Sequence, residues 1–190
     1  CTRFYDRREI KDALAYLHAV INPTDEVNLK RILNVPKRGI GDSTVGKLDA
    51  WANARSASFV EALRHIDDIG VRGPAVKGAA SFVELLDELI EMRDNGPASL
   101  LEAILDRSGY AAELQADHTI EAEGRLENLA ELVGVARDFE SIDEFLEKVS
   151  LVADTDSLDG DDSQVVLMTL HSAKGLEYPV VFLCGMEEGI

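Results

Sequence analysis

Apolar residues that recur every three to four positions constrain the fold of this chain more than any other feature of its sequence. In REIKDALAYLHAVI, residues 8–21, this spacing places four apolar residues on one face of a helix: Ile10, Leu14, Leu17 and Ile21. Pro23 then ends the run, since proline does not continue a helix. The same period returns in later segments as far as residue 152, so the pattern predicts a mostly α-helical fold around a shared core.

Turn residues and capping residues divide the rest of this helical sequence. Thr24 or Asp25 is expected to cap the second helix, and Asp42 or Ser43 the third, because short polar side chains accept hydrogen bonds from first-turn N–H groups. Ser58 is expected to start a short helix, and Ser141 to cap the last one. Between these two serines the pattern predicts helices at about 75–94, 99–108, 110–116 and 120–139.

The last residues of the chain have a different character. QVVLMTL (164–170) and PVVFLCG (179–185) are β-rich apolar runs of strand length, separated by a loop that contains glycine and lysine. This order predicts a short β-loop-β piece of an α/β domain, in which Cys184 is buried. The acidic stretch 154–163 is expected to be a linker between that piece and a helical domain over 11–153.

Composition narrows the classes of protein to which the chain can belong. No apolar run approaches the roughly 20 residues that span a bilayer, so no membrane association is expected. No secretion signal precedes the helices, and the two cysteines fit no metal-ligand spacing, so the expected location is a reduced cytoplasm and no metal site is assigned. The chain lacks an initiator methionine, so we expect it to be part of a longer protein.

The charge of the chain is unevenly distributed. The net charge is −17, from 19 basic and 36 acidic residues, and this total argues against nucleic-acid binding because phosphates repel an acidic surface. Between Lys30 and Lys47, however, five basic residues face a single acid, Asp42. From Glu113 to Asp162 the balance is strongly acidic. A proposed function therefore has to account for a basic cluster at residues 30–47 in a chain that is otherwise acidic.

The basic cluster contains the turn VPKRGIGDST, residues 35–44, between two predicted helices. Gly39 and Gly41 are expected to adopt positive φ and to let a phosphate approach the backbone, while Ile40 anchors the turn inward. N–H groups at the start of the next helix would face the anion. Three cations add charge without reading bases, which predicts sequence-independent DNA binding: Lys37, Arg38 and Lys47. The alternative is an ordinary turn between helices with solvated lysines.

A second group of candidate residues lies in TLHSAKGLE, 169–177, between the two expected strands. His171, Lys174 and Glu177 cluster in a loop at a strand end, where α/β proteins usually place their sites. The phosphate-binding pattern GxxxxGK[ST] occurs nowhere in the chain, and no nucleophile elbow is present. A structural role for the lone histidine is the alternative.

Three stretches together resemble UvrD/PcrA/Rep-type superfamily 1 ATP-dependent DNA helicases of bacteria. FYDRREIKDALAYL (4–17) resembles the segment that leaves the second RecA-like core domain, 2A, and enters the 2B accessory domain. VPKRGIGDST (35–44) resembles the GIG motif of 2B, and residues 165–190 are similar to motif V and its strands. The resemblance covers the chain in order, with about 50–150 recognised only as helical.

The resemblance implies a domain organisation and a role for each candidate residue. Residues 1–10 would end a 2A segment, with Arg8, Glu9 and Asp12 at the junction; 11–153 would form 2B, and 164–190 part of 2A. The duplex backbone would contact the GIG turn and its neighbours: Lys37, Arg38, Gly39, Ile40, Gly41, Thr44 and Lys47. Thr169 and His171 would lie near single-stranded DNA, Glu177 would reach the ribose of ATP, and Lys174 and Gly175 would shape the loop between the two sites.

The resemblance also implies a parent protein that is an ATP-dependent 3′-to-5′ DNA helicase of repair or replication, using ATP and Mg²⁺. The family's Walker A lysine, metal-binding acids and motif VI arginine are not in this sequence, so we expect no catalysis by this chain and no ATP or Mg²⁺ bound to it. Its expected partner is DNA at a single-strand/duplex junction. Its oligomeric state stays open.

Two alternatives compete with this interpretation. The acidic face between Glu113 and Asp162 could belong to a protein-interaction module that docks basic repair partners, with plain solvation as the simpler explanation. A free-standing helix-hairpin-helix repair protein without a motor is the other alternative, and the β-rich C-terminal runs argue against it.

Overall fold

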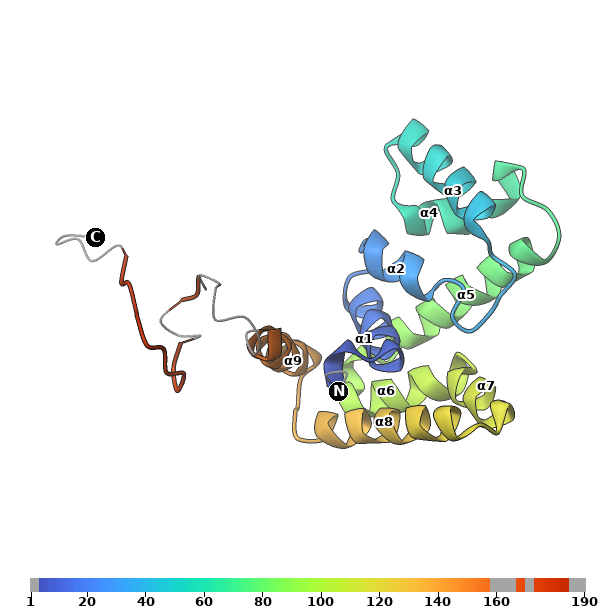
Figure 1. The fold of residues 1–190 in the computed structure, drawn as a ribbon. Coiled ribbons are helices and arrows are strands. Elements are labelled where there is room, and N and C mark those ends of the chain that lie inside the picture. Colours follow the sequence, from blue (N-terminus) through green and yellow to red (C-terminus); the bar gives the residue numbers. More distant parts are fainter. Residues whose placement is uncertain (1–3, 158–166, 170–172, 185–190) are drawn as a thin grey trace.

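The computed structural model describes residues 4–157, 167–169 and 173–184, and the regular elements in these ranges are all helical (Figure 1). The α-helices are α1 (Arg8–Ile21), α2 (Glu26–Ile32), α3 (Asp42–Arg55), α4 (Phe59–Arg64), α5 (Pro74–Glu91), α6 (Pro97–Arg107), α7 (Tyr110–Asp117), α8 (Ile120–Ala136) and α9 (Ile142–Ser157). Short 3₁₀ turns are η1 (Phe4–Asp6), η2 (Ile66–Ile69) and η3 (Arg93–Asn95). The prediction of a mostly α fold is confirmed.

Helix α1 lies at the centre of the helical body and packs against α2, α5, α6 and α8. In Figure 1, α3 and α4 lie above it with the start of α5, and α6, α7 and α8 lie below. The apolar stripe predicted for α1 is buried at Ile10 and Leu17, which are both 0% exposed, and the core is one continuous cluster that also includes Phe59 and Phe82.

Most helix boundaries follow the predicted caps. Asp25 accepts a hydrogen bond from the Asn28 N–H at 3.1 Å, and Ser141 accepts one from the Glu144 N–H at 3.2 Å. Pro74 and Pro97 are the first residues of α5 and α6, positions at which proline loses no helical hydrogen bond. Helix α9 continues to Ser157, into the stretch that was expected to be an acidic linker.

A buried polar network ties α1 to its neighbours. Asp12, 2% exposed, receives Arg31 from α2 at 2.8 Å and the Tyr110 hydroxyl from α7 at 3.0 Å. Glu9, 5% exposed, accepts from Asn128 of α8 at 2.6 Å. Buried carboxylates are tolerated only when they are paired in this way. The polar start of α1 therefore fixes three other helices to it.

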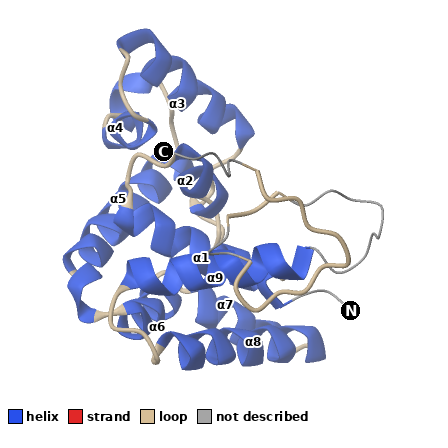
Figure 2. Ribbon diagram, turned by 90° about the vertical axis from the view of Figure 1, so that its left-hand side faces the viewer, coloured by secondary structure: helices blue, strands red, loops and turns tan. Residues whose placement is uncertain are grey.

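Strands were predicted at 164–170 and 179–185. The prediction is wrong for all the residues in these two ranges that the structure describes. Residues 167–169 and 179–184 lie in no regular element, and Figure 2 shows only helices and loops among the described residues. Leu167 is 92% and Phe182 86% exposed, and Cys184, expected to be buried, is exposed. A strand needs a neighbouring strand for its hydrogen bonds, and no described segment provides one.

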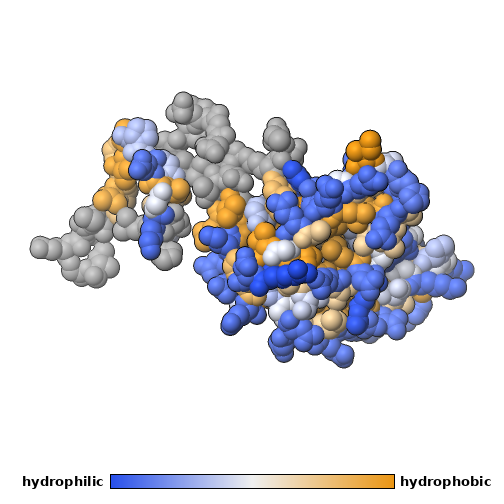
Figure 3. Space-filling model, turned by 90° about the horizontal axis from the view of Figure 1, so that it is seen from below, coloured by the Kyte–Doolittle hydropathy of each residue, from blue (hydrophilic) through white to orange (hydrophobic). Residues whose placement is uncertain are grey.

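The described C-terminal residues lie apart from the helical body, with their apolar side chains in the open (Figure 3). None of the described helices combines the length and the apolar character that a membrane crossing requires.

Candidate nucleic-acid interface

The turn between α2 and α3 is organised by Asn34. Its side-chain oxygen accepts hydrogen bonds from the N–H groups of Arg38, at 2.7 Å, and Ile40, at 3.3 Å. Ile40 is 2% exposed, so the predicted inward anchor of the turn is confirmed. The Val35–Pro36 peptide bond is cis. We call residues 35–44 the GIG hairpin.

Arg38 is part of the scaffold of this hairpin. Its guanidinium donates to the carbonyl oxygens of Ile32, Leu33 and Pro36 at 3.1, 3.2 and 3.2 Å. A further nitrogen donates to the Tyr16 hydroxyl at 2.8 Å, and the group lies over the Phe82 ring at 5.3 Å. Arg38 thus satisfies carbonyls at the end of α2, where the helix itself supplies no partner. These contacts turn both terminal nitrogens of Arg38 toward the protein, so its role here is to hold the hairpin in shape.

The two glycines of the hairpin have different conformations. Gly39 has φ +72°, as predicted, and a Cβ at this position would lie 3.1 Å from the Pro74 Cβ. Gly41 has φ −104°, so the prediction of a positive φ there is wrong. Gly41 is instead the residue before α3, and a Cβ built on it has no atom within 4 Å. Open space, rather than an unusual backbone angle, distinguishes this glycine.

The first turn of α3 lacks the side-chain cap that the sequence predicted. Asp42 and Ser43 lie inside the helix, and Gly41, at the capping position, has no side chain with which to accept a hydrogen bond. All three residues are exposed. Helix α3 is 14 residues long, and its N-terminal N–H groups carry the partial positive charge of the helix dipole. This end of α3 is therefore open to an external anion, with Asp42 as the one acid in its first turn.

Two of the five basic residues of the sequence cluster are neutralised within the protein. Lys30 contacts Asp49 at 2.7 Å and Glu26 at 3.1 Å, and the hydrogen bond to Asp49 raises the pKa of Lys30. Arg31 is held by the buried Asp12. Neither side chain has its charge free for a ligand.

Lys37 and Lys47 are exposed, and neither forms an ion pair with any described residue. The Lys47 ammonium lies 3.4 Å from the carbonyl oxygen of Gly70. Lysines in this state are available to a phosphate.

Two cations that the sequence did not single out lie beside the hairpin. Residues 70–78 run along the hairpin and α3. The Gly70 carbonyl oxygen receives the Lys47 ammonium of α3, a Cβ on Gly39 would meet Pro74, and a Cβ on Gly78 would meet the carbonyl oxygen of Arg38. Arg72 and Lys77 lie in this segment, exposed and without an ion pair to any described residue. Their proximity comes from the packing of α5 on the hairpin, so sequence spacing alone gave no signal for it.

The second predicted group is described in part. Thr169 accepts from the Ala173 N–H at 3.0 Å through its carbonyl, Gly175 has φ +87°, and Lys174 and Glu177 are exposed. His171 lies outside the described residues. The described residues of this group, Thr169 and 173–177, do not lie near the GIG hairpin (Figure 1). Among the described residues, no three acidic, histidine or cysteine side chains are placed to hold a metal ion.

Comparisons with known proteins identify the family to which the chain is similar. The family model described as the UvrD-like helicase C-terminal domain matches residues 1–71 and 74–190. The chain is 44% identical to the ATP-dependent DNA helicase PcrA of Bacillus subtilis over 100% of its length, and 43% identical to that of Staphylococcus epidermidis over 99%. It spans 27% of the length of each of these relatives.

Proposed function

The chain belongs to the UvrD-like helicase C-terminal domain family, and from this premise we propose that it is the DNA-contacting accessory region of an ATP-dependent DNA helicase. In this proposal the GIG hairpin binds the backbone of duplex DNA without reading its sequence. The observation that carries the proposal is the uncapped start of α3, together with four cations of the hairpin, α3 and the adjoining segment 70–78 that have no ion pair with a described residue: Lys37, Lys47, Arg72 and Lys77.

Each part of this surface suits a phosphate. N–H groups at the start of α3 donate to the anion, and the open space at Gly41 lets the backbone approach it. Lysine and arginine side chains add charge that falls on phosphates of any sequence. Asn34 and Arg38 hold the turn in shape from the protein side, so we assign Arg38 to positioning and Lys37 to contact.

The acidic remainder of the chain then determines the orientation of binding. With a net charge of −17, most of the protein surface repels DNA, so the chain is oriented with its GIG hairpin toward the duplex. The protein contacts only a few phosphates, so its affinity for DNA is low and decreases steeply as the salt concentration rises.

In the parent helicase we propose that the C-terminal group couples DNA to the ATP site. Thr169 and His171 would lie near single-stranded DNA, and the Glu177 carboxylate would accept a hydrogen bond from a ribose hydroxyl. Lys174 and Gly175 would shape the loop between them. The exposed Lys174 and Glu177 side chains on either side of the Gly175 turn are compatible with these roles. ATP and Mg²⁺ would be bound mainly by other parts of that protein, which acts in DNA repair or replication.

Fluorescence anisotropy with a DNA hairpin that carries a 3′ single-stranded tail tests the DNA-contact proposal. We expect Lys37→Glu and Gly41→Asp to weaken binding about tenfold, and the salt slope to fall by about 1 for each lost phosphate contact. Lys148→Glu, an identical charge change on α9, is the matched control and should have little effect. Equal losses in Lys37→Glu and Lys148→Glu would overturn the assignment of the GIG hairpin.

A further inference from the structure

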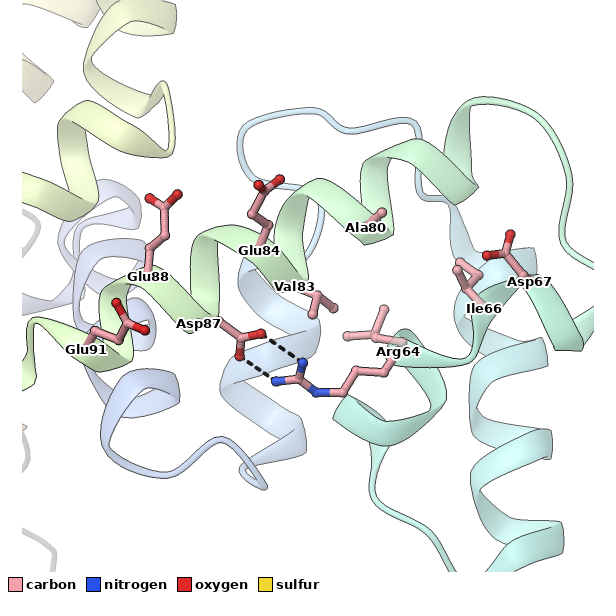
Figure 4. A pocket seen from close by; sticks show the side chains of 10 residues that line it. Arg64, Ile66, Asp67, Ala80, Val83, Glu84, Asp87, Glu88 and Glu91 are labelled. Atoms are coloured by element: carbon pink, nitrogen blue, oxygen red, sulfur yellow. Dashed lines mark hydrogen bonds and ion pairs between the residues drawn. The ribbon is translucent and has the colours of Figure 1, made fainter.

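A hollow of about 590 Å³ lies between α5 and the segment formed by α4 and η2. Apolar side chains from both segments line it: Leu63 and Ile66, themselves buried, lie beneath one side, and Ala80 and Val83, more exposed, lie on the other. Figure 4 shows a row of carboxylates along α5, above and beside this apolar lining. The hollow is thus a groove with an apolar floor and an acidic wall.

Some of the acids around the groove are already neutralised. The Asp87 carboxylate accepts hydrogen bonds from the two terminal guanidinium nitrogens of Arg64, at 2.8 and 2.5 Å, and these bonds lower the pKa of Asp87. Glu88 receives Arg107 at 3.0 Å. Three further acids of the lining have no ion pair with any described residue: Asp67, Glu84 and Glu91.

The unpaired acids are spread along the groove. Glu84 and Glu91 are seven residues apart on α5, which is about 10 Å at the rise of an α-helix. No three such side chains among the described residues converge on a point that could hold a metal ion. Charges spaced in this way match a row of cations on an extended ligand rather than a single ion.

The groove and the GIG hairpin use different faces of α5. Pro74, Gly78 and Phe82, four residues apart, face the hairpin. The groove is lined by residues such as Ala80, Glu84, Asp87 and Glu91. At 3.6 residues per turn these two sets lie on roughly opposite sides of the helix. A ligand in the groove would therefore leave the hairpin open.

We propose that this groove docks an amphipathic helix of a partner protein, with its apolar face on the floor and lysines or arginines against Glu84 and Glu91. Apolar anchors and flanking charges are the features by which grooves recognise amphipathic helices. Charge complementarity selects a basic partner and disfavours DNA, because the same carboxylates repel phosphates. This surface is distinct from the acidic stretch 113–162 and goes beyond the DNA-contact function.

A basic amphipathic peptide tests the proposal on the intact chain. The probe is about 18 residues long, a length above that at which isolated helices are marginal, with leucines on one face and lysines spaced seven apart beside them. Two control peptides keep its length: one has the same composition in scrambled order, and the other has glutamate in place of lysine. We expect saturable binding of the first peptide only, measured by anisotropy of a fluorophore on the peptide.

Matched variants locate the binding surface. The double change Glu84→Lys with Glu91→Lys should weaken peptide binding about tenfold or more, while Glu127→Lys with Glu131→Lys, an equal charge change at exposed residues of α8, should change it less than about twofold. Ala80→Gln lengthens a side chain at the floor without altering charge, and it should also weaken binding. The Glu84/Glu91 variant should still bind the tailed DNA hairpin, which separates this proposal from the DNA-contact function.

Three outcomes would overturn the proposal. Equal losses of peptide affinity in the α5 and α8 variants would show that the peptide binds any acidic surface of the chain. Equal affinity for the scrambled and the amphipathic peptides would show that an apolar face on the ligand is not required. A dimer of the chain that disappears in the Glu84/Glu91 variant would assign the groove to a second copy instead.

Discussion

The carbonyl oxygen of Arg38 lies only 2.0 Å from the position that a Cβ on Gly78 would occupy. Helix α5 and the GIG hairpin therefore meet backbone to backbone at this point, with no room for a side chain between them. The contact fixes the distance of the hairpin from α5, and through it the position of the start of α3. Gly78 thus belongs to the site although its own atoms would touch no ligand.

We expect Gly78→Ala to displace the hairpin. The added methyl group meets rigid backbone, and forcing it in costs about 1–3 kcal/mol, which outweighs the gain of about 1 kcal/mol from better helix propensity. Affinity for the tailed DNA hairpin should fall and the urea midpoint should decrease. Gly46→Ala in α3 is the control, because a Cβ there has no atom within 4 Å, and it should be neutral or stabilising. An unchanged urea midpoint and DNA affinity in Gly78→Ala would contradict this account.

Arg38 and Lys37 are neighbours with opposite expected phenotypes. Arg38→Lys keeps the charge but cannot reach three carbonyl oxygens and the Tyr16 hydroxyl at once, so unfolding free energy should fall by about 2 kcal/mol. Lys37→Ala should change stability by less than about 0.5 kcal/mol, because its side chain is exposed, while weakening DNA binding.

Urea unfolding followed through Trp51, the single tryptophan of the chain, measures the first effect, and DNA anisotropy measures the second. If Arg38→Lys is as stable as the parent chain and loses only DNA affinity, Arg38 contacts DNA and the scaffold role is wrong.

Local sequence signals predicted the helices and the position of the hairpin, because caps, breakers and apolar periods act over a few residues. Pro74, Asp25 and Ile40 each had a role that neighbouring residues define. The role of Arg38 arises from hydrogen bonds to carbonyl oxygens of its own turn and to Tyr16, 22 residues away. The role of Gly78 arises from the contact between α5 and the hairpin, whose partners are 40 residues apart, so residue spacing could not reveal either role. The cations beside the hairpin at Arg72 and Lys77 were missed for the same reason.

At the C-terminal apolar runs the sequence predicted a structure that is not found in the described residues. VVLMTL and PVVFLCG have strand composition, and composition was the basis of the prediction. Strand formation, however, depends on hydrogen bonds to another strand, and the described residues include no strand that could supply them. The Gly41 prediction failed more subtly, since glycine was read as a sign of positive φ, whereas its use here is to leave space.

Arg72 and Lys77 should behave as phosphate contacts if the surface beside the hairpin binds DNA. Arg72→Glu and Lys77→Glu should each weaken binding of the tailed hairpin about tenfold at low salt and lower the salt slope by about 1, equally for DNA of any sequence. Arg93→Glu, at an exposed arginine near the far end of α5, provides the control. A salt slope that stays constant in both variants would limit the interface to the GIG hairpin itself.

The Tyr110–Asp12 hydrogen bond gives the fold a dependence on alkaline pH. Burial, reinforced by the Asp12 carboxylate, raises the pKa of Tyr110 above its usual value near 10, so the folded chain keeps a proton that the unfolded chain loses. This contribution to stability is complete below pH 10 and declines as pH rises toward the folded pKa. The decline is smaller than the limit of about 1.4 kcal/mol per pH unit, because the ring is only half-buried.

Tyr110→Phe isolates this contribution from that of Tyr16, whose pKa burial also raises. The variant removes the hydroxyl that donates to Asp12, so it should be less stable than the parent chain by about 1.5 kcal/mol at pH 8. Above pH 10 the difference in unfolding free energy between the two should narrow. Only the parent chain has a Tyr110 hydroxyl that ionises more readily in the unfolded state than in the folded state, so only the parent chain loses stability as the pH rises. Urea unfolding curves at pH 8, 10 and 11 measure the gap directly. A gap that stays constant across this range would show that the pKa of Tyr110 is not raised in the folded chain. The absence of any gap at pH 8 would show that the link between α1 and α7 rests on packing alone.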